Sequence, residues 1–362
     1  MNRKNIVLAI LTLVTLAGFQ PSTPAGVLGG LGKMFGPSPV KLDESPVPEK
    51  SVSVDSFNQL KDCKKVVITA FNVQFITKKN ASAHAGRETE GAAHVNSNIK
   101  LTGLDQSIFQ TITDQAYTNF VKSLQTLGVE IMPYSEYTTR PEYADMKSYM
   151  KASPLEVSGG IFSGQPSQIF APQGMPIPLY GDEVAVGSGS LMSAGMGRST
   201  PIGLEPQIAK TTGVAAVHVY LVVDFCQLDV SGGTFSFSAN VKSKPQISLA
   251  KVSRLSFFFG NSMSGGREYV KLKNDAFGTD NYVTELKDVT TTGQKAGDAA
   301  ANVIGILGIL GILGGTGGTG GTYKTRSLEA VADPALYQAT CVKYLTAVQD
   351  MMIAGLKTKT GK

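Results

Sequence analysis

The feature that most constrains the fold is an apolar stretch at residues 64–76, Lys-Lys-Val-Val-Ile-Thr-Ala-Phe-Asn-Val-Gln-Phe-Ile. Its first half, 66–68, is apolar on both faces, whereas from Phe71 onward apolar residues alternate with Asn72 and Gln74. This pattern predicts a strand that is central in its sheet at one end and half exposed at the other. No catalytic motif accompanies it, so the stretch indicates architecture and not chemistry.

A long amphipathic helix is predicted next, at residues 105–127, because apolar residues recur there every three or four positions. The preceding Thr-Gly-Leu-Asp at 102–105 resembles a capping box. A short strand at 129–132 follows directly, and a polar stretch at 135–149 fits a second, more exposed helix. Strand, helix and strand in this order predict an α/β unit with parallel strands joined by a right-handed crossover.

The second half of the chain continues this pattern. A helix end, a turn at Gly213 and a nearly continuous apolar run at 214–225 predict a central parallel strand. Asp333 and Pro334 predict the start of a closing amphipathic helix at 334–357 that covers the sheet. Further strands, predicted to extend the sheet in antiparallel fashion, lie at 234–241, 246–259 and 282–288.

The predicted fold class is therefore α/β, with a mixed sheet flanked by amphipathic helices and with two long Gly-rich insertions. The chain opens with a basic segment, an apolar run about half the ~20 residues of a membrane span, and a Pro/Ser/Ala exit, which predict a secretory signal peptide. The expected parts are a signal peptide at 1–25, an extended leader or linker at 26–60, an α/β domain at 61–290 with an insertion at 153–205, a Gly-rich apolar low-complexity segment at 291–325, and a C-terminal part at 326–362 whose helix packs on the domain.

The two Gly-rich segments combine apolar residues with few charges. Long irregular insertions are usually functional or disordered, and both alternatives stay open for 153–205. The Ile-Leu-Gly repeats at 303–313 are shorter than the ~20 residues of a span, so they fit either contact with a bilayer or a neighbouring subunit, or a flexible connector. The candidate interaction residues are Phe162, Phe170, Ile177 and Leu179 in the first segment and Ile304, Ile306, Leu307, Ile309 and Leu310 in the second.

Charge and cysteines restrict the function classes. The chain has 33 Lys and Arg against 28 Asp and Glu, and no basic cluster is interleaved with aromatic residues, so no nucleic-acid partner is expected. An odd number of cysteines, Cys63, Cys226 and Cys341, allows either one disulfide with one free thiol or three buried thiols. Their spacing does not fit a zinc site, and no cofactor is expected.

The three histidines of the chain are candidates for metal binding or catalysis. His84 and His94 lie in the polar stretch 78–98, predicted to be a loop, and without a third ligand at a regular spacing we expect solvated residues and no metal site. His218 lies in a predicted strand with Asp224 six residues on, which suggests a dyad, but no nucleophile accompanies them. We therefore expect His218 to be a hydrogen-bonded core residue and predict no catalytic residue.

The order of elements carries one resemblance. An apolar strand after a signal peptide, a long helix, a strand headed by Gly-Val-Glu-Ile at 128–131, and Ala-Lys-Thr-Thr-Gly-Val-Ala-Ala-Val-His-Val-Tyr at 209–220 resemble the periplasmic α/β domain shared by the curli-secretion lipoprotein CsgG and TolB amino-terminal domains. The similarity spans about 64–289 and implies the same fold, with the helix and Thr-Gly step placing the third strand. Two departures are the absent lipid-anchoring cysteine and the insertion at 153–205.

Together these features predict an exported bacterial cell-envelope component, structural or assembly in role, oligomeric, not an enzyme, and linked to outer-membrane secretion or a surface apparatus. It is expected in the periplasm or at the outer membrane, with secretion as an alternative, and its partners are expected to be copies of itself or other envelope proteins, with peripheral membrane contact. Two other functions stay open: an exported hydrolase or binding protein with a cleft near His218, and a membrane-active secreted protein that uses 303–313.

Overall fold

The protein was analysed as a computed structural model, which describes residues 39–44, 46–55, 59–86, 93–157, 165–178, 201–233, 238–260, 268–299 and 322–361. The described part is a mixed α/β fold, which confirms the predicted class. The signal peptide, Phe162, Leu179 and the repeats at 303–313 lie outside the described residues.

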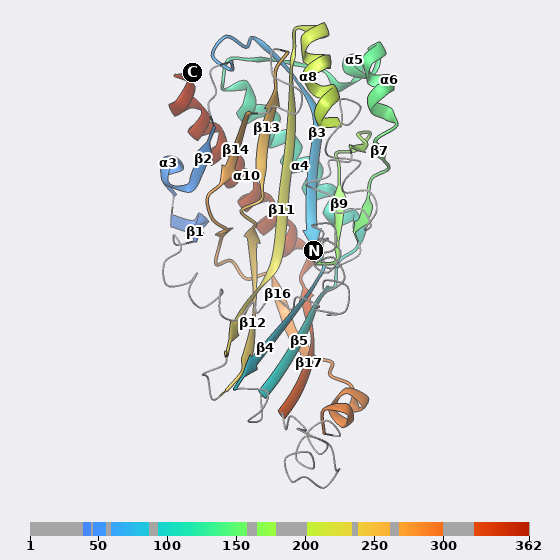
Figure 1. Cartoon of the computed structure of the whole chain (residues 1–362), viewed down its shortest axis with the longest axis vertical. Helices are drawn as coiled ribbons and strands as arrows, with labels where there is room; N and C mark the ends of the chain where they lie inside the picture. Colours follow the sequence, from blue (N-terminus) through green and yellow to red (C-terminus); the bar gives the residue numbers. More distant parts are fainter. Residues whose placement is uncertain are drawn as a thin grey trace, which may run out of the picture. The chain divides into compact units, whose positions relative to one another are not determined.

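Two long parallel strands form the centre of the large sheet. Strand β3 (Lys65–Ile76) pairs with β11 (Ala215–Ser231) from Val66 opposite Ala215 to Phe75 opposite Val223. From β3 the chain runs through a hairpin at 78–102 and helix α4 (Gln106–Gln125) to β6 (Glu130–Met132), which pairs in parallel with the other edge of β3. The predicted parallel strands and long helix are therefore present, with a hairpin that was not predicted inserted before the helix; Figure 1 shows β3 and α4.

Further strands extend the sheet beyond β11, and all but the outermost strand, at 40–41, are antiparallel to their neighbours. The predicted strand at 246–259 is interrupted at 250–253, and the predicted strand at 282–288 belongs to a second sheet. One end of β11 continues into β13 (Arg254–Phe258), β14 (Glu268–Leu272) and β2 (Val52–Val54), and the other end into β12 (Asn240–Leu249), β15 (Ala276–Phe277) and β1 (Val40–Lys41). Beyond β3 lie β9 (Ser167–Phe170) and β8 (Leu155–Val157), while β10 (Ile177–Pro178) and β7 (Met150–Lys151) form a separate pair.

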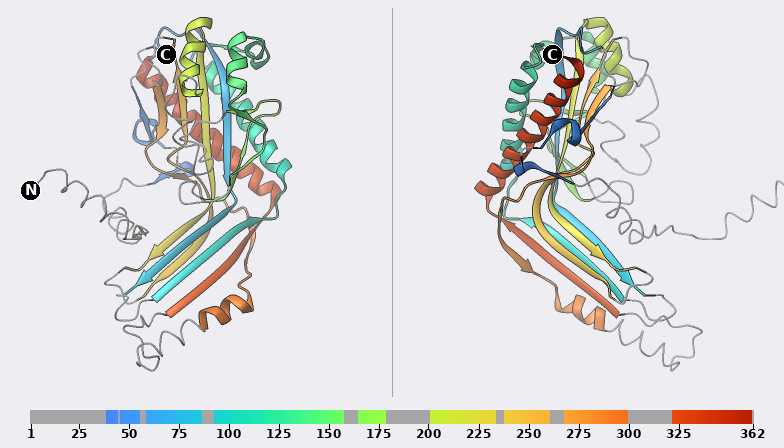
Figure 2. Two further views of the ribbon diagram at one scale, coloured as in Figure 1. Left: turned by 45° about the vertical axis from the view of Figure 1, so that its right-hand side comes forward. Right: turned by 90° about the vertical axis from the view of Figure 1, so that its left-hand side faces the viewer.

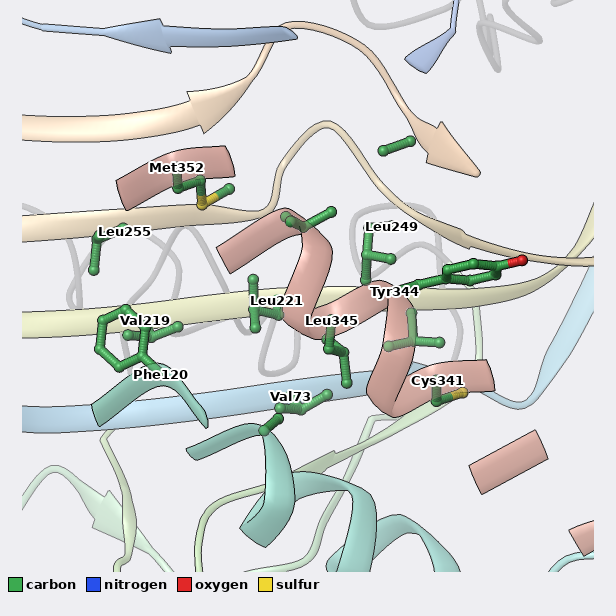
Figure 3. Close-up of a cluster of buried hydrophobic side chains, with 14 of the residues drawn as sticks. Val73, Phe120, Val219, Leu221, Leu249, Leu255, Cys341, Tyr344, Leu345 and Met352 are labelled. Carbon is green, nitrogen blue, oxygen red and sulfur yellow. The ribbon is translucent and has the colours of Figure 1, made fainter. Parts of the chain in front are cut away.

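Helices cover both faces of this sheet. On one face α4 and α10 (Pro334–Thr360) lie side by side over the main core, where Phe120 meets Val73 and Val219 in one cluster (Figures 2 and 3). Helices α5 (Tyr134–Thr138), α6 (Pro141–Lys147) and α8 (Pro201–Thr212) pack on the opposite face. The predicted caps hold for α10, whose Asp333 accepts from Leu336 N, whereas Asp105 and not Thr102 caps α4.

A second, separate sheet has four strands, in the order β16 (Val283–Asp288), β17 (Thr322–Ala332), β5 (Ala93–Thr102) and β4 (Lys78–Ala85). Only Thr77 separates β3 from β4, so one chain segment runs from the large sheet into the small one. The far halves of β11 and β12 pack against β4 and β5 (Figure 2).

The predicted loop at 78–98 is therefore wrong, because most of it forms the hairpin of β4 and β5. Alternate residues of this hairpin, such as Ala83, Ala85 and Ile99, are buried between the layers. The buried side of β4 is made of alanine, so its period-two pattern is nearly invisible to a search for large apolar residues.

Two other segments differ from expectation. Residues 39–55, expected to be part of an extended leader, contribute β1, β2, the short helices η1 (Leu42–Glu44) and α3 (Pro48–Ser51), and the buried side chain of Val52. Similarly, the low-complexity segment contributes a helical stretch at 292–299 and the first residues of β17. Strands β1 and β2 are short and partly polar, and they are held in place by pairing with β15 and β14, respectively.

Among the described residues, no helix combines the length and the apolar character needed to cross a membrane.

Candidate functional site

The candidate interaction residues that the structure describes lie in the core. Phe170 in β9 is 1% exposed and packs against Phe75 and Phe109, with ring centroids 5.9 and 5.7 Å away. Ile177 in β10 is fully buried. Their apolar character is explained by packing within this chain, so neither contributes to an interaction surface in this structure. The other seven residues lie outside the described part.

His218 does not form a dyad with Asp224. In β11 it lies opposite Ser256 of β13 and Ala70 of β3, and it is 1% exposed. Six residues of extended strand span roughly 20 Å, at about 3.3 Å per residue, so sharing a face does not bring the two side chains together. The expectation that His218 is a buried core residue agrees with this position.

Asp224 has a different partner, in the part of β11 that extends beyond its pairing with β3 and packs against β4 of the four-stranded sheet. Its Oδ2 accepts from Lys79 Nζ of β4 at 2.5 Å, and its Oδ1 accepts from Cys226 N at 3.0 Å, where the β11–β12 register shifts. Lys79 Nζ also donates to Cys226 O at 2.5 Å. Burial raises the pKa of Asp224, and the ammonium of Lys79 opposes that change. This ion pair therefore joins β4 of the four-stranded sheet to β11 of the large sheet.

A band of polar side chains crosses the sheet face that carries His218. The Tyr220 hydroxyl donates to Gln74 Oε1, Gln74 Nε2 donates to Ser167 Oγ at 2.6 Å, and Arg254 lies 5.4 Å from the Tyr220 ring centroid. The expectation that this half of β3 is half exposed is wrong, because it is buried on both faces.

Asn72 is the exceptional member of this band. It lies opposite Tyr220 and is fully buried, and neither its Oδ1 nor its Nδ2 has a hydrogen-bond partner among the residues that the structure describes. The Ser256 hydroxyl is likewise buried without a partner. Because buried polar groups are nearly always paired, an unpaired amide and hydroxyl on one face of a sheet require an explanation.

The described pockets lie elsewhere and lack a catalytic arrangement. Two shallow pockets, of about 320 and 460 Å³, adjoin α4 and share Asp114 and Thr118. The Asp114 carboxylate is occupied, since its Oδ1 accepts from Gln173 N at 2.8 Å and from Gln110 Nε2 at 3.0 Å. In the residues lining these two pockets, no histidine, cysteine or second carboxylate accompanies it.

His84 and His94 face each other across the β4–β5 hairpin. They are opposite in register, their ring centroids lie 6.4 Å apart, and the rings are nearly parallel, at 26°. Tyr323 of β17 stacks on the other side of His94, at 4.8 Å and 10°. The sequence placed both histidines in a loop, and the signal that could have found the pair is its symmetric position about the hairpin turn.

The outermost strands of the four-stranded sheet are β4 and β16, and the edge of β4 is partly occupied. On β4, alternate backbone groups point away from β5: Asn80 N donates to Gln165 Oε1 at 3.0 Å and His84 O accepts from Gly233 N at 2.6 Å. On the opposite edge, every residue of β16 after Val283 is exposed, including Leu286 at 40%. These two strands are the places where a further strand could be added to this sheet.

No disulfide joins the three cysteines, and Cys226 and Cys341 are buried whereas Cys63 is partly buried. The alternative of three buried thiols therefore holds for Cys226 and Cys341 and not fully for Cys63. Burial raises the pKa of Cys226 to about 12, so it is not a reactive thiolate at neutral pH.

Comparison with known proteins identifies no relative. No family model, no curated protein and no solved structure matches this chain.

Proposed function

We propose that this protein is an exported structural or assembly component of the bacterial cell envelope, that it associates with copies of itself, and that it is not an enzyme. The observation that carries the proposal is the exposed edge strand β16 of the four-stranded sheet, with β4, whose edge is partly occupied, on the opposite side. An exposed strand edge presents unpaired N–H and C=O groups and is a template for pairing with another chain.

Not every edge of the fold is equally available. Strand β12 carries Lys242, Lys244 and Pro245 in its half that runs beyond β15, and lysine and proline are the residues that protect an edge from pairing. By contrast, β16 presents Leu286, and both of its faces are exposed. The β16 edge is therefore the better candidate for a contact with a second copy.

The strand directions specify what that contact would look like. Strand β4 is antiparallel to β5, β5 is parallel to β17, and β17 is antiparallel to β16, so β4 and β16 run in the same direction on opposite edges. Pairing β16 of one copy with β4 of the next is a head-to-tail contact, which builds rings when the rotation closes.

The cellular part of the proposal rests on the sequence. The basic and apolar start is a secretory signal, and the order of β3, α4, β6, α8 and β11 is compatible with the resemblance to CsgG and TolB amino-terminal domains. This resemblance also supports a link to outer-membrane secretion or a surface apparatus. Other envelope proteins, or a peripheral contact with the membrane, are the further partners that we propose.

A binding function near His218 is the second candidate. It is favoured by the fully buried, unpartnered amide of Asn72 on the same sheet face. A ligand or partner group that completes its hydrogen bonds would explain this residue.

Light scattering during size-exclusion chromatography tests the assembly proposal. The mature wild-type protein is expected to elute as a closed oligomer, and Leu286→Lys is expected to shift it to monomer by placing a charge on the β16 edge. The control is Leu336→Lys, because Leu336 is also half exposed, at 50%, but lies in the first turn of α10. A wild-type monomer at all concentrations, or equal effects of both substitutions, would reject the proposal.

A further inference from the structure

The outer face of the four-stranded sheet carries two neighbouring histidines, His84 and His94, that are close enough to bind one metal ion together after small movements. His84 and His94 are direct cross-strand neighbours on the same face, and both side chains are partly exposed to solvent. Directly opposed residues on antiparallel strands have Cβ atoms about 4.5–5.5 Å apart. Two imidazoles at this spacing reach a common ion by small changes in side-chain torsion, starting from the 6.4 Å separation of their ring centroids.

The backbone beneath this pair is held by the β11–β12 turn. Gly233 N donates to His84 O at 2.6 Å, and Gly86 N donates to Gly233 O at 3.2 Å. Gly232 has a φ of +150°, and a Cβ there would lie 2.2 Å from His84 O, so only glycine permits this approach. The end of β4 is therefore tied to the neighbouring layer, and the position of His84 is set before any ligand arrives.

The second histidine is positioned from its other side. Tyr323 stacks on His94 with ring centroids 4.8 Å apart and ring planes 10° apart. In the next row of the same face, Ser82 Oγ donates to Asn96 Oδ1 at 2.7 Å. The His94 ring is thus confined between Tyr323 and His84, which limits the torsional freedom that metal binding would otherwise have to remove.

The ligand class follows from the donor atoms. Neutral imidazole is the usual protein ligand of Zn²⁺, Cu²⁺ and Ni²⁺, and for a fixed nitrogen donor set Cu²⁺ binds most tightly. Within the described residues no cluster of three or more histidine, cysteine or carboxylate side chains forms, so water would fill the remaining positions. Metal–nitrogen distances of about 2.0–2.1 Å require the two rings to lean toward each other.

We propose that His84 and His94 form an open, two-histidine site for a divalent transition-metal ion, with Cu²⁺ bound more tightly than Zn²⁺. The ion would join β4 to β5 near the end of the hairpin, and its open positions would accept a ligand from solvent or from another molecule. The proposal does not depend on self-association, because both ligands come from one chain.

The test is a titration of the untagged mature protein with CuCl₂, followed by calorimetry and by electron paramagnetic resonance. One Cu²⁺ per chain is expected, with hyperfine coupling to two imidazole nitrogens and with at least tenfold tighter binding than Zn²⁺. His84→Asn and His94→Asn should each weaken Cu²⁺ binding at least tenfold. The matched control Ser82→Ala, on the same strand and face, should bind as the wild type does.

Two results would overturn the proposal. One is wild-type affinity in both histidine variants, which would place the copper on the amino terminus or elsewhere. The other is a wild-type spectrum without coupling to imidazole nitrogen. Because the spectrum is recorded on the unaltered protein, it decides the question even if a variant does not fold.

Discussion

Asn72 shows how a single residue can conflict with its surroundings. Its neighbours along β3, Phe71 and Val73, are buried in the core below the sheet, whereas Asn72 points to the opposite face and is buried there without a hydrogen-bond partner. A buried polar group that has lost water and gained no partner costs roughly 1–3 kcal/mol. A protein keeps such an unfavourable group mainly at positions where the group has a role other than stability.

Replacing this amide with an apolar group of similar volume should therefore stabilise the protein. For Asn72→Leu we expect the free energy of unfolding to rise by about 1–2 kcal/mol, measured by urea denaturation. Asn72→Ala is the control, because it removes the amide but leaves a cavity, and should give a smaller gain or a loss. A decrease of more than about 1 kcal/mol for Asn72→Leu would show that the amide is hydrogen-bonded in solution.

At the scale of elements, the packing of α4 and α10 on the sheet holds the large layer together. Phe120 of α4 is 1% exposed and lies 5.7 Å from Phe71 between ring centroids. Polar bonds join the two helices along their line of contact, including Asn119 Nδ2 to Thr346 Oγ1 at 2.9 Å and Ser123 Oγ to Asp350 Oδ1 at 2.6 Å. The polar residues of α4 are thus not all solvent-facing.

Truncation of Phe120 tests this packing. Phe120→Ala is expected to lower the free energy of unfolding by about 3–5 kcal/mol, through lost apolar burial and the cavity left behind. Gln115→Ala, at an exposed position of the same helix, should change it by less than about 0.5 kcal/mol. Similar small effects of both substitutions in urea melts would contradict the observed orientation of α4.

A buried ion pair, Lys79 with Asp224, joins the four-stranded sheet to the large sheet. The side chains of Lys79 and Asp224 are 15% and 17% exposed, and removing one member of such a pair leaves the other charge uncompensated. Lys79→Met is therefore expected to cost roughly 3 kcal/mol at pH 7, and adding Asp224→Asn should recover much of that loss. A double variant that is no more stable than Lys79→Met would contradict this account.

The pH dependence gives an independent check on the same pair. A carboxyl whose pKa is raised in the folded state binds its proton more tightly when folded, so stability falls as pH rises from the unfolded pKa toward the folded one. Without the Lys79 ammonium this effect grows. The cost of Lys79→Met should therefore be larger at pH 7 than at pH 4, and a cost that does not change with pH would argue against an ionised Asp224.

At the scale of the whole molecule, the sequence predicted the α/β class and its central elements because these are long and strongly periodic. Strand β3 and the helices α4 and α10 fall within three residues of their expected positions, whereas β11 runs six residues beyond its expected end at 225. The hairpin of β4 and β5 was missed because alanine replaces large apolar residues on its buried side.

The candidate sites were less predictable, for a physical reason. The pair of Lys79 and Asp224 is created by packing between strands far apart in the sequence, which local sequence patterns do not encode. The pair of His84 and His94 depends only on the register of one hairpin, and it was missed because that hairpin was predicted to be a loop. Conversely, Phe170 and Ile177 were assigned to an interaction surface because their flanking glycines and prolines suggest an irregular loop, although their side chains are in the core.

The central claim is that copies of this chain associate through the β4 and β16 edges, and disulfide trapping tests it most directly. One cysteine is introduced on each edge, as Ser82→Cys and Leu286→Cys in the same chain, and the mature protein is oxidised and separated under denaturing, non-reducing conditions. Wild type reports the background from Cys63, Cys226 and Cys341. We expect a ladder of covalent multimers from the double variant and none from either single variant. A double variant that remains monomeric, while eluting at the mass of a monomer, would contradict the claim.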